Sequence, residues 1–245
     1  MTLTQTTKKT RTRAERAIEI VLRAYDRSWT PRREDPFKSL IHTILSQNTN
    51  WRNEDTAYRR LEETIWVSPT TLADAQIAKI AEAIKPAGMY NTRSRVIKQV
   101  SEQVLARFGG DLGPVVAKPY AEAREELMTL PGVGEKTADV VLLFNAGKHV
   151  IPVDRHIARI AKRLEIVPRS APYDKIRTTL EQSTPPETYL DTHIKLIQLG
   201  REKCRPQHPK CQNCPLNILC PQQPQQNPTN TKQEKPTPKN LKQPQ

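Results

Sequence analysis

The sequence has little glycine, few aromatic residues and no long apolar segment. It contains 8 glycines and 5% Phe, Trp and Tyr in 245 residues. Scarce glycine argues against an all-β fold and against a doubly wound α/β fold with several glycine-rich loops. The apolar runs, such as Val140–Phe144, are far shorter than the ~20 residues of a membrane helix. Residues 1–9 lack the apolar core of a secretory signal, so we expect a soluble intracellular protein.

Positive charge, in contrast, is abundant. The chain carries 39 Lys and Arg against 26 Asp and Glu, a formal net charge of +13 at pH 7. Such an excess predicts a polyanionic partner, either nucleic acid or an anionic membrane surface. Part of the charge lies in two polar segments without apolar periodicity, residues 1–13 and 222–245, which we expect to be disordered. The second is interpreted as a solvated tail or as a weak electrostatic tether to DNA.

Apolar residues repeat mostly at helical spacing. Such stripes occur at 18–25, 37–45, 77–84, 96–108, 157–164 and 189–197. The fourth stripe stops at Gly109 and Gly110, which is typical of a helix end. Only His149–Val153 resembles a strand, and it is too short and isolated to build a sheet. The pattern predicts an all-α fold of about ten helices.

The segment Leu130–Asp139 reads LPGVGEKTAD and lies between helices predicted over 119–129 and 135–146. Pro131 ends the first helix, and the two glycines that follow permit a turn whose backbone closely approaches a ligand. Free N–H groups at the start of the second helix suit an anion. We therefore predict phosphate contacts at Gly132, Val133 and Gly134. Taken alone, the Gly-x-Gly pattern is equally compatible with a plain helix–turn–helix corner.

Lys136 and Asp154 are the candidate reactive residues. Lys136 lies in the first turn of a predicted helix, where the helix dipole and some burial lower the pKa of an amine. A free amine can attack an electrophilic carbon such as a sugar C1′ and form a Schiff base, whereas a lone lysine in a basic protein is most often solvated. Asp154 directly precedes a predicted helix, so it is a candidate N-cap. It can also activate a nucleophile or stabilise a cationic transition state, because a cap fixes its position.

All four cysteines lie close together near the end of the chain. Cys204, Cys211, Cys214 and Cys220 follow the spacing C-x6-C-x2-C-x5-C. Thiolates at this density bind a metal or an iron–sulfur cluster. A single C-x2-C pair favours a cluster over structural zinc, and an intracellular setting disfavours disulfides. The intervening loop carries Arg205 and Lys210, so the cluster could brace a basic loop against a DNA phosphate without redox chemistry.

Together these residues resemble the endonuclease III family of DNA base-excision repair glycosylases, over about residues 14–221. The segment at 130–138 resembles that family's helix–hairpin–helix, Asp154 lies at the family's distance from Lys136, and the cysteine spacing matches its [4Fe–4S] pattern. The resemblance implies that Lys136 is the Schiff-base nucleophile and that Asp154 assists base departure. It also implies a [4Fe–4S] cofactor held by the four cysteines.

Two further segments resemble the family's means of filling the gap left by a flipped base. Met89 would be the apolar wedge, and Gln47 or Asn48 would plug the space opposite the orphaned base. Gln47 and Asn48 both remain candidates for the plugging residue, because an ungapped match favours Asn48 while the usual family pattern has glutamine. Trp51 and Tyr90 are interpreted either as base-stacking or as core residues.

Chain order predicts two helical domains with a DNA-binding cleft between them. Residues 30–145 would form a six-helix domain, and residues 14–29 with 146–221 the iron–sulfur cluster domain. The predicted activity is a bifunctional DNA glycosylase and abasic-site lyase that excises damaged, oxidised pyrimidines. Alternatives are a monofunctional uracil or thymine mismatch glycosylase, and a non-catalytic lesion-binding protein with a structural cluster. We expect a monomer on double-stranded DNA with a damaged base or abasic site, no membrane partner, and a cytoplasmic, nucleoid-associated location (nuclear or organellar in a eukaryote).

Overall fold

The structure, a computed structural model, describes residues 10–26 and 35–222. This part of the chain contains twelve α-helices, four short 3₁₀ helices and no strand, which confirms the predicted all-α fold. No helix within it is both long and apolar enough to cross a membrane. The predicted tails lie outside the described residues, except for residues 10–13 and 222, as does the predicted domain boundary between residues 29 and 30.

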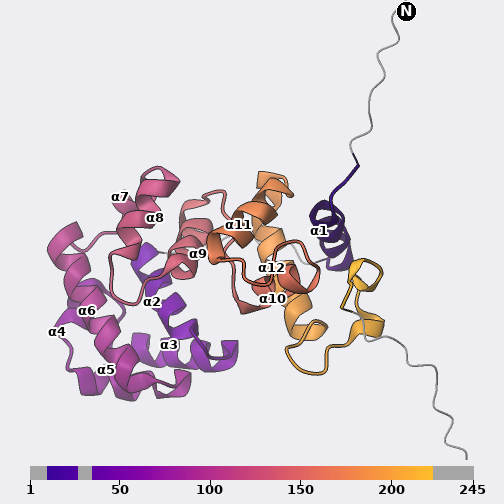
Figure 1. Ribbon diagram of the computed structural model, residues 1–245. Coiled ribbons are helices and arrows are strands. Elements are labelled where there is room, and N and C mark those ends of the chain that lie inside the picture. The colour runs from indigo at the N-terminus through magenta and orange to yellow at the C-terminus, as the bar shows by residue number, and fades with distance from the viewer. Residues whose placement is uncertain (1–9, 27–34, 223–245) are drawn as a thin grey trace, which may run out of the picture.

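The helices lie along the chain in the following order. They are α1 (Arg13–Ala24), α2 (Pro36–Ser46), α3 (Trp51–Ile65), α4 (Pro69–Asp74), α5 (Ile77–Ala83), η1 (Lys85–Ala87), α6 (Tyr90–Phe108), α7 (Gly113–Ala117), α8 (Tyr120–Met128), α9 (Glu135–Ala146), α10 (Arg155–Arg163), α11 (Tyr173–Gln182), η2 (Pro186–Thr188), α12 (Tyr189–Glu202), η3 (Cys211–Asn213) and η4 (Asn217–Leu219). Figure 1 shows α2–α9 gathered on one side and α1 with α10–α12 on the other.

Local chemistry explains where the helices begin and end. Thr12 caps α1 in a capping box with Glu15, in which each side chain accepts from the other residue's backbone N–H. Asn50 caps α3 by accepting two backbone N–H groups. As predicted, α6 ends at Gly109, which adopts a left-handed conformation with φ 59°. These capped ends fix the directions in which neighbouring loops leave the helices.

The segment between Pro36 and Ala146 contains eight α-helices, not the six predicted. The difference comes from short helices that begin with a proline in their first turn. Pro69 opens the six-residue α4, and Pro114 lies in the first turn of the five-residue α7. Proline is tolerated in a first turn because its missing N–H needs no partner there, but it cannot continue a preceding helix. Apolar stripes this short lack a full helical repeat.

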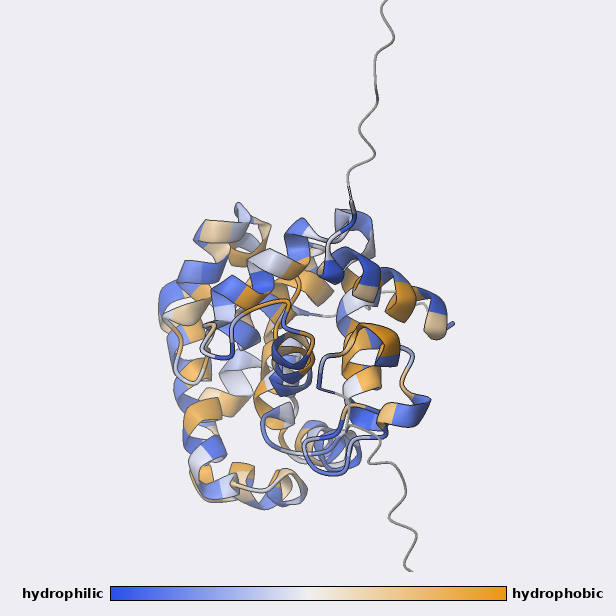
Figure 2. Ribbon diagram, turned by 45° about the vertical axis from the view of Figure 1, so that its right-hand side comes forward, coloured by the Kyte–Doolittle hydropathy of each residue, from blue (hydrophilic) through white to orange (hydrophobic). Residues whose placement is uncertain are grey.

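Buried apolar side chains form two clusters. The first is built from α2–α9 and includes Leu40, Leu45 and Leu142; the second is built from α1, α10–α12 and the cysteine segment and includes Leu199 and Leu216. Each fully buried side chain of this kind stabilises the fold by about 1.5–3 kcal/mol. Figure 2 shows that the helices present polar residues on one side and apolar residues on the other. The chain passes from the first cluster to the second between α9 and α10, immediately before Asp154.

Candidate active site

The predicted hairpin lies between α8 and α9. Gly132 has φ +72°, and a Cβ built on it would lie 2.6 Å from Val96 Cγ1 of α6. Only glycine fits this turn without strain, because both the conformation and the space exclude a side chain. Gly134 is the N-cap of α9 and is exposed. Helix geometry leaves the first N–H groups of α9 without helical partners, directed away from the helix.

Val133, a predicted phosphate contact, has its side chain in the core of the protein. Its side chain is 5% exposed and belongs to the first apolar cluster. Its N–H donates to the Leu130 carbonyl at 3.2 Å and so closes the turn. Val133 therefore fastens the hairpin to the core, and the exposed backbone on either side of it, at Gly132 and Gly134, is what a phosphate can approach.

Lys136 lies in the first turn of α9 and lines a pocket of about 670 Å³. Residues from α2, α3, α9 and α12 form the walls: Ser39, His42, Thr43, Ser46, Glu54, Val140, Phe144, His193, Ile194, Ile197, Gln198, Arg201 and Glu202. Burial lowers the pKa of Lys136, while the negative charges of Asp154 and Glu54 oppose that shift. The pocket therefore raises the fraction of free amine, the form that attacks carbon.

Asp154 caps α10, as its position in the sequence predicts. Its Oδ1 accepts from the N–H groups of His156 and Ile157, each at 2.8 Å. After burial, the charge of Asp154 is the largest influence on the pKa of Lys136, so the fold brings together two residues that are 18 positions apart. The cap fixes the position of a carboxylate whose charge acts on the Lys136 amine, so the two predicted roles of Asp154 are compatible.

Side chains from α11 and α12 hold every residue of the segment before Asp154. The N–H of Ile151 donates to Glu181 Oε1 at 3.0 Å, and the N–H of Val153 donates to the Tyr173 hydroxyl at 3.2 Å. The Pro152 carbonyl lies 2.8 Å from Nδ1 of His193. Because a carbonyl only accepts, Nδ1 carries the proton. Burial lowers the pKa of His193 to about 4, so the ring is neutral at pH 7.

Gln47 and Asn48, in the loop after α2, differ in their contacts within the protein. Gln47 Nε2 donates to the Gly132 carbonyl at 3.2 Å and to Thr137 Oγ1 at 3.4 Å, which ties the loop to the hairpin. Asn48 is exposed and adopts a left-handed conformation with φ 53°. Trp51, at the start of α3, is 61% exposed and so is not a core residue. Gln47 is engaged within the protein, whereas Asn48 and Trp51 face solvent.

Met89 also faces solvent. It is the N-cap of α6, has φ 50° and is 60% exposed, which excludes a core position. Tyr90 beside it is 36% exposed. The guanidinium of the buried Arg93 donates to the carbonyls of Ala87 and Gly88 and so holds this loop. Since α6 contacts Gly132 through Val96 and Gln47 bonds the same glycine, the loops around residues 48, 89 and 132 lie near one another.

The four cysteines surround a cavity of about 160 Å³, and none of them forms a disulfide. In the part of the chain that the structure describes, no three His, Cys, Asp or Glu side chains converge on one point as a single metal ion requires. Burial raises the pKa values of Cys214 and Cys220, and the other thiolates of the group raise them further. Four cysteine thiols around a cavity are the residues that could hold a metal or an iron–sulfur cluster.

The loop between Cys204 and Cys211 presents the two predicted basic contacts. Arg205 and Lys210 are both exposed. Arg163 of α10 bonds this loop. Its Nη1 donates to the Arg205 carbonyl at 2.7 Å and lies 3.4 Å from Cys204 Sγ. The loop is thus fixed to the same helix that Asp154 caps.

Several residues of the site carry no signal in the sequence. His42 and Glu54 lie on different helices, yet His42 Nδ1 is 2.8 Å from Glu54 Oε1, and the His42 ring lies 4.2 Å from that of Tyr58. His193 is likewise distant in sequence from Lys136. Only the helical spacing of apolar neighbours could have placed these residues on inward faces; their convergence is a result of tertiary packing.

Comparisons with known proteins identify the family of the chain. The family model described as HhH-GPD superfamily base excision DNA repair protein matches residues 41–186. Endonuclease III of Thermotoga maritima is 34% identical over 186 residues, which cover 76% of this chain and 83% of that protein. A thymine/uracil-DNA glycosylase of Pyrobaculum aerophilum is 30% identical over 193 residues, covering 76% of this chain and 80% of that one.

The fold is also similar to that of a solved structure, a trapped endonuclease III–DNA covalent intermediate. The TM-score is 0.75 at 28% sequence identity, and the match covers 86% of this chain and 97% of the other. These findings confirm the family resemblance predicted from the hairpin, Asp154 and the cysteines. The chain belongs to the HhH-GPD superfamily of base excision DNA repair proteins, as an endonuclease III-like DNA glycosylase.

Proposed function

We propose that the protein is a bifunctional DNA glycosylase and abasic-site lyase. The observation that carries the proposal is a desolvated lysine amine in a pocket beside a capped aspartate. In the first step, the Lys136 amine attacks C1′ and the bond from C1′ to the base breaks, with its electron pair leaving on the base. The Asp154 carboxylate stabilises the positive charge that develops on the sugar. Similarity to a trapped endonuclease III–DNA covalent intermediate supports this assignment.

The second step opens the strand. The C1′–O4′ bond breaks as the lysine forms a Schiff base, and loss of a proton from C2′ then expels the 3′ phosphate by β-elimination. No water has to enter the site for strand cleavage, because the amine remains bonded to the sugar until elimination is complete. A largely buried amine suits this sequence, since solvent reaches the Schiff base slowly.

The exposed residues around the hairpin would bind the DNA. Reaching a base within a duplex requires rotating it out of the stack, and side chains must fill the space it leaves. Met89 is the proposed wedge, and Asn48 the proposed plug, because Gln47 is already bonded to Gly132 and Thr137. Backbone N–H groups near Gly134 would receive one phosphate, and Arg205 with Lys210 another.

A [4Fe–4S] cluster is the cofactor that the four cysteines fit. Cys204, Cys211, Cys214 and Cys220 would hold it through their thiolates, and it would supply a rigid brace for the loop that carries Arg205 and Lys210. Its proposed role is structural. The purified protein should be brown, and replacing Cys214 by serine should remove the colour and lower the melting temperature; a colourless protein with bound zinc would contradict this assignment.

The proposed substrate is a damaged, oxidised pyrimidine in double-stranded DNA. The pocket offers groups that can bond the polar edge of such a base, among them Glu54, Gln198 and Ser39. A second candidate is a monofunctional uracil or thymine mismatch glycosylase, which the similarity to a thymine/uracil-DNA glycosylase favours. That enzyme would release the base and leave the abasic strand intact.

A panel of duplexes tests the proposal directly. Each duplex carries one lesion: an oxidised thymine, hydroxycytosine, uracil or a thymine opposite guanine. The expected result is release of an oxidised pyrimidine together with a β-elimination end on the 3′ side of the lesion. Intact abasic strands would support the mismatch glycosylase instead. Lesion binding without turnover on any duplex would support a non-catalytic lesion-binding protein.

The remaining predictions concern the whole protein. We propose that the two apolar clusters are the cores of two domains, with the DNA-binding cleft at the pocket that α2, α3 and α9 line together with α12. The protein would act as a monomer, located in the cytoplasm with the nucleoid, or in the nucleus or an organelle of a eukaryote. Analytical ultracentrifugation at micromolar concentration tests the monomer.

A further inference from the structure

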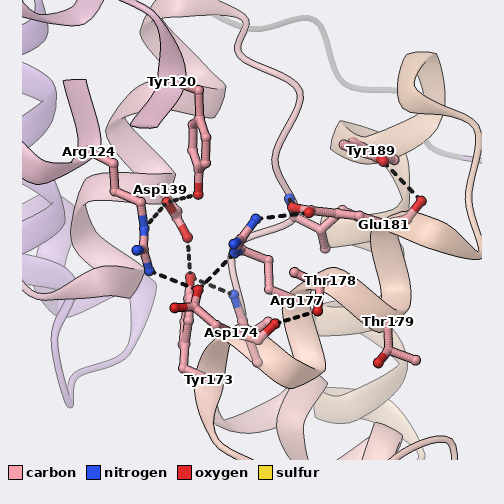
Figure 3. Close-up of polar contacts among 12 residues, drawn as sticks. Tyr120, Arg124, Asp139, Tyr173, Asp174, Arg177, Thr178, Thr179, Glu181 and Tyr189 are labelled. Carbon is pink, nitrogen blue, oxygen red and sulfur yellow. Dashed lines mark hydrogen bonds and ion pairs between the residues drawn. The ribbon is translucent and has the colours of Figure 1, made fainter. Parts of the chain in front are cut away.

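Asp139 is an ionisable residue in the interior of the molecule, three residues after Lys136 on α9. It is 0% exposed, yet both of its oxygens have partners. Oδ1 accepts from the Tyr120 hydroxyl at 2.8 Å and from Arg124 Nε at 3.1 Å, and Oδ2 accepts from the Tyr173 hydroxyl at 2.7 Å. Figure 3 shows the carboxylate surrounded by these three side chains. Burying a carboxylate is costly unless it is paired and hydrogen-bonded in this way.

The partners of Asp139 come from both sides of the molecule. Tyr120 and Arg124 belong to α8, and Tyr120 packs on the first apolar cluster; Tyr173 belongs to α11 and packs on the second. Arg124 also reaches α11, where its Nη2 lies 3.1 Å from Asp174 Oδ1. Asp139, which lies on α9 with Lys136, therefore joins that helix to α11 as well as to α8.

Tyr173 extends the connection to Asp154. Its hydroxyl donates to Asp139 and at the same time accepts from the N–H of Val153 at 3.2 Å. Burial raises the pKa of Asp139, while the hydroxyls of Tyr173 and Tyr120 and the charge of Arg124 oppose that shift. As a carboxylate, Asp139 only accepts, so it fixes the direction of the Tyr173 O–H and leaves an oxygen lone pair for the Val153 N–H. Burial raises the pKa of Tyr173, so the phenol stays protonated and keeps donating.

Tyr120 provides a natural comparison. It donates to the same carboxylate over almost the same distance, 2.8 Å against 2.7 Å for Tyr173. Within the described part of the chain, its hydroxyl bonds Asp139 and makes no hydrogen bond to the segment at 151–154. The two phenols thus differ in one respect that bears on the reaction, the bond to Val153.

We propose that Tyr173 is a positioning residue for Asp154, with Asp139 as its anchor. The bonded chain Asp139–Tyr173–Val153 sets the place of the Asp154 carboxylate relative to Lys136. The inference rests on the proposed function, because it assumes that Asp154 assists base departure. Removing the bonds of Tyr173 should therefore affect one step only. Base excision slows, while Lys136 still reacts with an existing abasic site, because that site has no base to expel.

The matched variants are Tyr173→Phe and Tyr120→Phe. Each removes one phenol oxygen from Asp139, and Tyr173→Phe also leaves the Val153 N–H without its acceptor, so we expect the larger fall in melting temperature for Tyr173→Phe. Tyr173→Phe should slow single-turnover excision of a damaged base by about tenfold, because small misplacements of a reacting group cost this much or more. Its borohydride trapping on preformed abasic-site DNA should stay within about twofold of the unchanged protein, and Tyr120→Phe should do so in both assays. Asp139→Asn, which loses the charge that orients Tyr173, should give the same split as Tyr173→Phe.

Equal excision rates for the two tyrosine variants, or an equal loss of excision and trapping in Tyr173→Phe, would overturn the proposal. If Tyr173→Phe does not fold, Asp139→Asn decides by the same comparison. Asp154→Asn distinguishes the two levels of the account. If that variant excises bases at the normal rate, the part of the proposed function that gives Asp154 a role in base departure fails. If it is slow while Tyr173→Phe is normal, only the positioning role of Tyr173 fails.

Discussion

Lys136 occupies an environment that disfavours its positive charge in two ways. It lies in the first turn of α9, at the positive end of the helix dipole, and burial in the pocket lowers its pKa. The first effect could be predicted from the sequence, because Gly134 and the apolar stripe that follows define the start of the helix. The second could not, since His193 and Arg201, which share the pocket, come from α12.

The pH dependence of Schiff-base formation follows from this shift. Burial, the largest cause, lowers the pKa of Lys136 from its ordinary value of 10.5. The free amine reacts, so single-turnover cleavage of abasic-site DNA should rise with pH and level off below pH 10.5. Glu54→Gln should move the profile to lower pH, because the Glu54 charge raises the pKa of Lys136. A rate that still rises at the pH where ordinary lysines lose their protons would contradict the shift.

Asp154→Asn separates the two roles of this residue. Asparagine is as good an N-cap as aspartate, so the bonds to His156 and Ile157 remain possible and the melting temperature should change little. Base excision should slow by about a hundredfold or more, because the negative charge beside C1′ is lost. Asp154→Ala is the comparison: it should in addition cost about 1 kcal/mol in the free energy of unfolding, measured by urea denaturation.

At the scale of elements, the hairpin shows what a sequence can and cannot predict. Helices predicted over 119–129 and 135–146 correspond to α8 (Tyr120–Met128) and α9 (Glu135–Ala146), because proline and glycine mark their ends. The packing of the Val133 side chain into the first apolar cluster was not predicted, since an apolar residue in a loop carries no sign of the core that it contacts. The bond between Gln47 and Gly132 joins residues 85 positions apart, and no local pattern contains it.

Gly132 and Gly134 allow a controlled test of the hairpin. Gly132→Ala forces a left-handed alanine and places its Cβ 2.6 Å from Val96 Cγ1, so it should destabilise the protein by about 1–3 kcal/mol. Gly134→Ala meets nothing within 4 Å and has φ −97°, so it should cost no more than about 0.5–1 kcal/mol, because alanine is a poorer N-cap than glycine. Val96→Ala in the Gly132→Ala background should restore part of the loss. Equal unfolding free energies for the two alanine variants would contradict the geometry.

At the scale of the whole molecule, the net charge of +13 is distributed over parts with different roles. Some of it is in ion pairs that hold the fold together, such as Arg124 with Asp139 and Asp174. Some is exposed on the cysteine loop, where Arg205 and Lys210 face solvent. The composition predicts a polyanionic binding partner, and the order of the motifs identifies that partner as DNA. The mostly buried position of Arg124, whose ion pairs join α8 to α9 and α11, could not be predicted, because charged residues are mostly exposed.

The exposed loop charges should govern the salt dependence of DNA binding. Each phosphate contact releases counterions, so replacing both Arg205 and Lys210 by glutamine should reduce the slope of log affinity against log salt by about 2. The reduction in slope should be the same for damaged and undamaged duplexes. Lys79→Gln is the control, because Lys79 is exposed on α5, at the other end of the molecule from the cysteine loop (Figure 1). An unchanged slope in the double variant would exclude the loop from the DNA interface.

Borohydride trapping of Lys136→Gln tests the central claim, that Lys136 is the nucleophile. Glutamine has no amine but fills a similar volume at the start of α9, so the fold and DNA binding should persist, as checked by melting temperature and by affinity for abasic-site DNA. The unchanged protein should form a covalent complex with DNA when borohydride is present, and the variant should form none. A trapped complex in Lys136→Gln at the rate of the unchanged protein would show that another amine attacks the sugar and would contradict the account.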